Sequence, residues 1–290
     1  MSFVLVTDAV CDLNADVVNS LGVEVLPMEF TIGDKVYKHY PDCREMSIKD
    51  FYQAIREGAM PTTSQININS FNKAFEPILK EGKDILYLCF TSGLSGTYNT
   101  CMIAVSDLLE KYPERKILVL DSACASLGEG NLVYHVANKV NSGATLEEAY
   151  EYAKETKNRV AHWFVVDDLE HLKRGGRISS LSATFGKALQ IKPLLSVDDD
   201  GHLITVAKIR GYLKVFDNLV DRLVRDGEDL ESQTVFIGHA DNPEGAEKLS
   251  RMVEPLVGKV IIGNIGPVIG AHVGAGMLAL TFLGDRKSVV

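Results

Sequence analysis

Hydroxyl and glycine residues are concentrated in one short segment, residues 90–98, which reads Phe-Thr-Ser-Gly-Leu-Ser-Gly-Thr-Tyr. It follows the apolar run at residues 85–90 and precedes a helical pattern, so we expect a turn between a strand and a helix. Such a turn presents hydroxyl groups and unpaired backbone N–H groups that can bind an anion. A second hydroxyl cluster, residues 61–65, lies just before another predicted helix. The two clusters together predict one anion-binding site.

A single histidine lies in the most glycine-rich part of the chain. Residues 263–276 contain five glycines around His272. Glycine allows tight turns and close approach of backbone, so this pattern predicts a tight loop that presents His272 at a site lined by backbone. A lone histidine is more often structural, but this setting makes His272 the histidine that we expect at the polar site.

Two basic clusters, residues 173–177 and 208–214, stand out in an otherwise acidic chain. Basic residues at helix ends and turns are commonly caps or solvated surface. The alternative is a docking surface for phosphate or for an acidic partner. The pair Gly175 and Gly176 favours docking, because paired glycines let backbone come close to a ligand or partner.

The same turn is also compatible with two other functions. A serine hydrolase would use Ser95 as nucleophile, His272 as base and Asp8 or Asp121 to orient the histidine. Residues 93–97, Gly-Leu-Ser-Gly-Thr, lack the final glycine of the G-x-S-x-G motif, which weakens this alternative. The third possibility is a binder of a small phosphate or sugar-phosphate ligand.

Composition narrows the choice of protein class. The chain has 290 residues, 46% of them apolar, and a net charge of −9, which indicates a globular protein of two domains and argues against nucleic-acid binding. The first residues lack a basic leader, and no apolar run approaches the roughly 18 residues of a membrane span, so we expect a cytoplasmic protein. The five cysteines form no C-x-x-C pair and the histidines form no H-x-x-x-H pair, so we expect reduced thiols, no metal site and no cofactor.

Alternating strand and helix patterns predict an α/β fold. In the first half, strands are expected at residues 3–6, 23–30, 85–90 and 117–120, in a largely parallel sheet with a hairpin added at Gly33 and Asp34. Ser47 and Thr145 look like the starts of capping boxes.

The second half predicts a mixed sheet. Its strands are expected at residues 162–166, 194–197, 204–209, 235–237, 260–262 and 278–283. The turn at residues 198–201 predicts a hairpin rather than a calcium loop. We place the domain boundary between residues 160 and 161, which gives an N-terminal α/β domain, 1–160, and a C-terminal α/β domain, 161–290.

The motifs in this order resemble the DegV family along essentially the whole chain. They are Val-Thr-Asp at residues 6–8, Thr-Ser-Gln at 63–65, Ser-Gly-Leu-Ser-Gly-Thr-Tyr at 92–98, Asp-Ser at 121–122, Leu-Lys-Arg-Gly-Gly-Arg-Ile at 172–178, Lys-x-Arg at 208–210 and Gly-x-His-x-Gly-x-Gly at 270–276. The sequence departs from the family pattern at Ala9, Ile66, Ala271 and Ala275, and these changes leave the motifs recognisable.

The resemblance implies a carrier of a long-chain fatty acid rather than an enzyme, with the acyl chain buried between the two α/β domains. It implies that the hydroxyls of Thr63 and Ser95, the backbone N–H of Gly96 and the side chain of His272 bind the carboxylate. An ATP-dependent fatty acid kinase would phosphorylate the bound acid to acyl phosphate for phospholipid synthesis. Arg174 and Arg210 match the basic positions that face this kinase. Apolar helices at residues 71–79 and 181–189 are candidates to line the acyl tunnel.

Overall fold

The first half of the chain forms a parallel sheet with helices on both faces. A computed structural model describes residues 2–167, 169–178 and 191–284. In this part of the chain the sheet has the strand order β2-β1-β6-β7, with every pair parallel, as predicted. The strands are β1 (Phe3–Asp8), β2 (Glu24–Leu26), β6 (Asp84–Cys89) and β7 (Ile117–Asp121).

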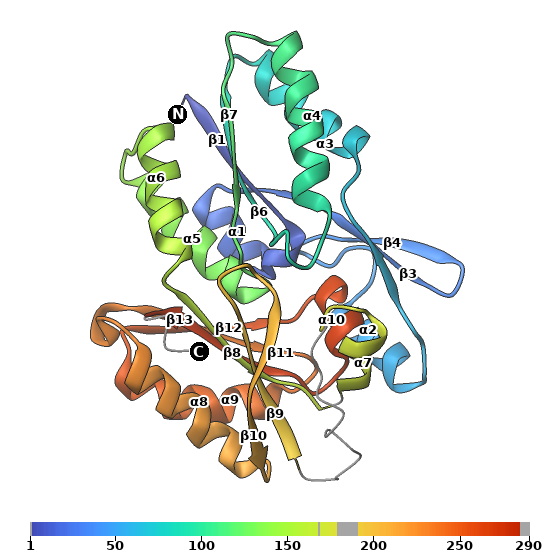
Figure 1. The fold of residues 1–290 in the computed structure, drawn as a ribbon, viewed down its shortest axis with the longest axis vertical. Coiled ribbons are helices and arrows are strands. Elements are labelled where there is room, and N and C mark those ends of the chain that lie inside the picture. The colour runs from blue at the N-terminus through green and yellow to red at the C-terminus, as the bar shows by residue number, and fades with distance from the viewer. Residues whose placement is uncertain (1, 168, 179–190, 285–290) are drawn as a thin grey trace.

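Alternation along β6 explains how both faces of this sheet are covered. Ile85 and Tyr87 pack with the helices α3 (Ile68–Lys80) and α4 (Thr97–Lys111), while Leu86 and Leu88 pack with α1 (Ala15–Leu21), α5 (Leu127–Asn141) and α6 (Leu146–Lys157). Figure 1 shows α3 and α4 on one side of the strands and α5 and α6 on the other. Thr145 caps α6 in a capping box, as predicted, and Ser47 accepts the N–H of Asp50 at the start of α2 (Ile48–Arg56).

The strand predicted at residues 23–30 is interrupted, because Pro27 has no N–H to continue a ladder. The chain divides there into β2 and β3 (Met28–Ile32). The predicted hairpin at Gly33 forms between β3 and β4 (Lys35–His39), but it is not part of the parallel sheet. It pairs instead with β5 (Thr62–Ser64) in a sheet of order β4-β3-β5, in which Phe30 lies opposite Thr63.

The second half forms the mixed sheet that the sequence predicts, with strand order β10-β9-β8-β13-β11-β12 in the described residues. Its strands are β8 (Val160–Val165), β9 (Ile191–Val197), β10 (Leu203–Arg210), β11 (Thr234–His239), β12 (Lys259–Asn264) and β13 (Leu278–Leu283). Only β11 and β12 pair in parallel among these strands, and residues 198–201 connect β9 to β10 as an antiparallel hairpin.

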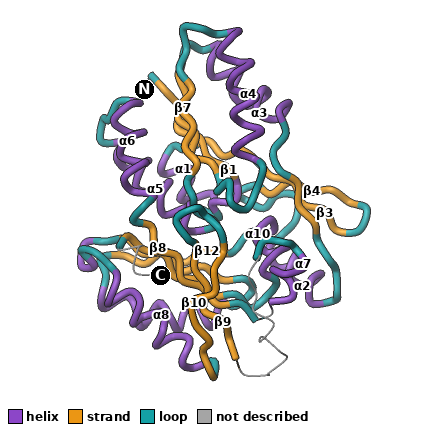
Figure 2. Tube along the Cα trace, in the orientation of Figure 1, coloured by secondary structure: helices purple, strands orange, loops and turns teal. Residues whose placement is uncertain are grey.

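Helices cover this sheet unequally. The helices α8 (Leu213–Asp226) and α9 (Pro243–Val253) pack on one face, and α7 (Leu169–Arg174) and α10 (Pro267–Val273) lie toward the first half of the chain (Figures 1 and 2). Short 3-10 helices are η1 (Ala9–Cys11), η2 (Leu230–Ser232) and η3 (Glu254–Leu256). The domain boundary between residues 160 and 161 stays a prediction. Helix α5 packs on the first sheet and also contacts β8, β11 and β13, so the two large sheets share this helix. The tunnel helix predicted at residues 181–189 lies outside the described residues.

One buried carboxyl group joins the start of α5 to the start of α10. Asp12 follows η1 with a left-handed backbone, φ 54°, and its side chain is 6% exposed. Its Oδ1 accepts the backbone N–H of Gly266 at 2.9 Å, and its Oδ2 accepts the hydroxyl of Ser126 at 2.5 Å. A Cβ at position 266 would lie 2.1 Å from Cε1 of the buried His39, so only glycine fits beside this carboxyl.

Replacing Asp12 by asparagine should change how stability depends on pH. Burial raises the pKa of Asp12 to about 8, despite the hydrogen bonds from Ser126 and Gly266. An unfolded aspartate titrates near pH 4, so between about pH 4 and about pH 8 unfolding releases a proton and Asp12 stabilises the fold less as pH rises, by up to about 1.4 kcal/mol per pH unit. In the Asp12→Asn variant the amide oxygen can still accept the N–H of Gly266, and the amide NH2 can donate to the hydroxyl oxygen of Ser126, so both partners are retained while this titration is lost.

Urea unfolding of both proteins between about pH 5 and about pH 9 measures the difference. We expect the unfolding free energy of Asp12→Asn to rise relative to that of the unmodified chain up to about pH 8 and to stay constant above it. A difference that does not vary with pH would show that Asp12 ionises normally in the folded protein.

Candidate ligand-binding site

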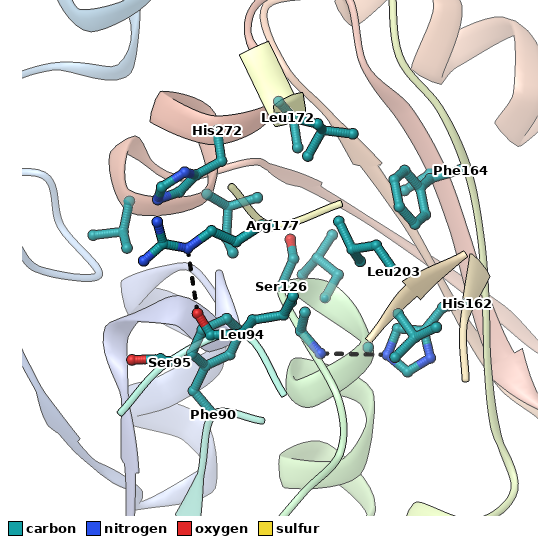
Figure 3. A pocket seen from close by; sticks show the side chains of 18 of the residues that line it. Phe90, Leu94, Ser95, Ser126, His162, Phe164, Leu172, Arg177, Leu203 and His272 are labelled. Carbon is teal, nitrogen blue, oxygen red and sulfur yellow. Dashed lines mark hydrogen bonds between the residues drawn. The ribbon is translucent and has the colours of Figure 1, made fainter. Parts of the chain in front are cut away.

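A cavity of about 280 Å³ lies where the two halves of the chain meet. Its walls come from β3, β5, the turn before α4, the start of α5, β8, α7 and α10, so segments far apart in sequence build it together. Its interior is mainly apolar, with side chains such as Met28, Phe90, Phe164, Val197 and Ile269. Polar side chains gather at one end, where Ser95, Arg177 and His272 lie close together (Figure 3).

The two hydroxyl clusters and the histidine predicted from the sequence line this same cavity. Thr63 on β5 places its Oγ1 2.9 Å from Nε2 of His272 on α10. Ser95 and Gly96 belong to the turn that leads into α4 and line the cavity as well. The Ser95 hydroxyl lies 2.9 Å from Oγ1 of Thr97 and accepts the Thr97 N–H at 3.2 Å. Their role in binding a carboxylate stays a prediction.

His272 lies in the last turn of the helix α10, so the prediction of a tight loop around it is wrong. Pro267 occupies the first turn of α10, where proline is favoured, and Gly274 follows the helix with φ 72°. Gly270 lies inside this helix, and a Cβ there would come 2.6 Å from the hydroxyl of Tyr52, so glycine is needed for the helix to pack against this ring. These glycines therefore serve close packing and a helix end, rather than an extended loop.

His272 is neutral at physiological pH. Burial, together with the smaller effect of the positive charge of Arg177, lowers its pKa to about 4. Its Nδ1 atom is buried without a hydrogen-bond partner in the described part of the chain. A Cβ at Gly175 would lie 2.5 Å from this nitrogen, so this glycine of the basic cluster lets the end of α7 approach the histidine. The site thus offers a neutral imidazole beside a hydroxyl.

Arg177 belongs to the basic cluster at residues 173–177, and its sequence context predicted no role for it in the site. The structure puts this exposed guanidinium at the polar end of the cavity, where its Nε donates to the carbonyl of Leu94 at 3.4 Å (Figure 3). The signal in the sequence was its place just after Gly175, the glycine that lets this segment lie close to His272. A positive charge at this mouth favours an anionic ligand.

Close backbone packing fixes the turn that carries Ser95. A Cβ at Gly93 would lie 2.7 Å from the backbone oxygen of Asp200, and one at Gly201 would lie 1.8 Å from Oγ1 of Thr91. The Thr91 hydroxyl donates to the carbonyl of Gly201 at 3.2 Å and accepts the N–H of Gly93 at 3.1 Å. The hairpin turn between β9 and β10 therefore packs directly against the turn that carries Ser95.

The structure does not assemble the triad that a serine hydrolase needs. Asp8 accepts hydrogen bonds from Tyr87, from the N–H of Phe90 and from the N–H of Val10. Asp121 accepts the backbone N–H groups of Ala123 and Ser92. Both carboxylates that could orient the histidine thus accept hydrogen bonds from neighbouring turns and strands, and neither is a partner of Nδ1 of His272.

The basic residues predicted to face a partner lie on the surface. Arg174 ends α7 and Arg210 ends β10, both are exposed, and neither is among the residues that line the cavity. Within the described ranges, no three His, Cys, Asp or Glu side chains gather as a metal site, and the five cysteines form no disulfide. No helix of the described residues combines the length and apolarity needed to cross a bilayer.

Comparison with known proteins extends these observations. The family described as "Uncharacterised protein, DegV family" matches residues 2–285. A DegV domain-containing protein of Clostridium perfringens is 45% identical, over 98% of this chain and 98% of its own length. A fatty-acid-binding DegV family protein of Thermus thermophilus superposes with a TM-score of 0.87 at 28% identity, over 98% of this chain and 100% of that one. DegV of Bacillus subtilis, a fatty acid binding protein, superposes with a TM-score of 0.85 at 26% identity, over 98% and 99% of the two chains. The chain therefore belongs to the DegV family.

Proposed function

We propose that this chain binds one long-chain fatty acid, with the tail in the cavity and the carboxylate at its polar end. The observation that carries the proposal is the shape of the site: a single cavity joins an apolar interior to a cluster of hydroxyls and a neutral histidine. The fatty acid bound by the Thermus thermophilus and Bacillus subtilis relatives supports the same ligand class.

The tail provides most of the binding free energy. Burial of apolar surface contributes about 0.8 kcal/mol per methylene, so a sixteen-carbon chain offers roughly 12 kcal/mol before the costs of association. The carboxylate then needs only enough hydrogen bonds to offset its desolvation. We assign these to the hydroxyls of Thr63 and Ser95, the N–H of Gly96 and the ring of His272.

We further propose that a partner kinase acts on the bound acid. A carboxylate oxygen would attack the γ-phosphorus of the kinase's ATP, the bond to the leaving ADP would break, and acyl phosphate would form for phospholipid synthesis. Hydroxyl ligands suit this step because they do not hold the carboxylate in a buried ion pair with arginine. Its oxygens therefore remain available for the reaction. Arg174 and Arg210 are exposed basic residues on a chain of net charge −9, and we assign them to the kinase interface.

Native mass spectrometry of the purified chain, followed by solvent extraction, tests the ligand. We expect one long-chain fatty acid per chain, which returns when delipidated protein is incubated with the acid. A polar phosphate ligand in its place, with no uptake of fatty acid, would contradict the proposal and favour a small-phosphate binder. Ester turnover that is lost in Ser95→Ala would favour a hydrolase.

Substitutions should separate lipid binding from phosphorylation. Thr63→Ala and Ser95→Ala each remove a hydroxyl that we assign to the carboxylate, so we expect affinity for the acid to fall about 10- to 100-fold, the worth of a hydrogen bond to a charged group. Arg174→Ala should bind the acid normally and lose phosphorylation by the kinase. Fluorescent fatty-acid displacement and acyl-phosphate formation measure the two effects. Equal loss of lipid by all three variants would contradict this division.

Binding should be insensitive to pH near neutrality. His272 has a pKa of about 4, so it takes up no proton when the acid binds above about pH 6, where a carboxylate in water is already ionised. We expect the dissociation constant of a fatty acid below its micelle concentration to stay constant from about pH 6.5 to about pH 8.5. A tenfold weakening per pH unit in this range would mean that His272 binds as an imidazolium.

A further inference from the structure

A second histidine lies at the end of the cavity opposite the polar head. Figure 3 shows His162 and Phe164 across the cavity from Ser95 and His272. Both come from β8, whose neighbouring side chain Trp163 points to the other face and packs with the core under α8 and α9. The pleat of β8 therefore directs His162 toward the space that the acyl tail would occupy.

Hydrogen bonds to backbone hold this imidazole in place. His162 is 4% exposed, and its Nδ1 lies 3.1 Å from the carbonyl oxygen of Val160. A carbonyl only accepts hydrogen bonds, so Nδ1 carries the hydrogen and Nε2 is an acceptor. That Nε2 accepts the N–H of Ala125 at a long 3.5 Å. The far end of the apolar cavity is thus closed by a polar ring.

Helix α5 supports the ring from the side. A Cβ at Gly128 would lie 1.8 Å from Nε2 of His162, 2.1 Å from its Cδ2 and 2.8 Å from its Cε1. The ring therefore lies directly against the first turn of the helix, in the space that glycine leaves open. Any larger residue at position 128 must push the ring away from α5.

We propose that His162, seated against Gly128, is the floor of the acyl pocket and determines the longest chain that the protein binds. This inference rests on the proposed function. A tail that ends before the ring gains affinity with each carbon. A longer tail must break the bonds of the imidazole to Val160 and Ala125, or press methylenes against its acceptor nitrogen, and both oppose binding.

Competition with saturated fatty acids of increasing length tests the floor. We expect the affinity of the unmodified chain to rise with length to a maximum and then to fall at least tenfold within a few more carbons. His162→Ala should move the maximum to longer acids. His162→Phe replaces the ring by one of similar size and should keep the maximum close to its original place. Gly128→Ala should displace the ring into the cavity and move the maximum to shorter acids.

The outcomes separate this inference from the proposed function. An unchanged order of preference in His162→Ala and Gly128→Ala, with all proteins binding fatty acid, would overturn the role of His162 and leave the carrier function intact. Failure of the unmodified chain to bind any acid would overturn the carrier function itself, and this inference with it.

A measurement on the unmodified protein does not depend on the folding of variants. With a fatty acid that carries ¹³C at its terminal methyl, at the length of maximum affinity, we expect nuclear Overhauser contacts from that methyl to the ring protons of His162. Contacts to other cavity residues and none to His162 would overturn the proposal.

Discussion

The carboxyl group of Asp12 is the interaction on which the arrangement of the site depends. No cation of the described residues lies beside this buried group, and its two oxygens accept hydrogen bonds from the N–H of Gly266 at the start of α10 and from the hydroxyl of Ser126 at the start of α5. The helix α10 carries His272, and Ser126 lines the cavity. One buried group therefore fixes both the head of the site and part of its wall, and a proton rather than a counter-ion offsets its burial.

Glycines make the second set of constraints, because they let backbone and rings come closer than a side chain would permit. Gly93 and Gly201 bring the turn of the second sheet onto the turn that holds Ser95, and Gly175 brings α7 onto His272. Because these segments are closely packed, the backbone at the polar end of the cavity has little room to move. The hydroxyls and the imidazole are consequently held in place before a ligand arrives, which lowers the entropy lost on binding.

Local sequence patterns predicted most strands of both sheets, because alternation and turn residues act within a few residues. The two hydroxyl clusters around Thr63 and Ser95 also predicted one anion site with His272 nearby, and the resemblance to the DegV family added Gly96. The structure brings all four residues to one cavity. The patterns failed where long-range packing decides. Five glycines predicted a loop around His272, although they serve close contacts with residues such as Tyr52 and His171. The separate sheet of β3, β4 and β5 could not be predicted from local alternation, which carries no information on strand partners.

The residues that sequence reasoning missed, Arg177 and His162, show the same limit. Gly128 of α5 leaves the space that the ring of His162 occupies, and Gly175 lets the segment that carries Arg177 lie close to His272. Neither contact can be read from the residues beside His162 or Arg177 alone. Apolar burial of a tail is strong but non-directional, so it cannot by itself define which way a fatty acid enters or how long it is. Direction requires polar groups at one end of the cavity, and length requires a fixed obstacle at the other. The structure provides hydroxyls and His272 at the first end and His162 at the second, so affinity and selection can come from different parts of one cavity.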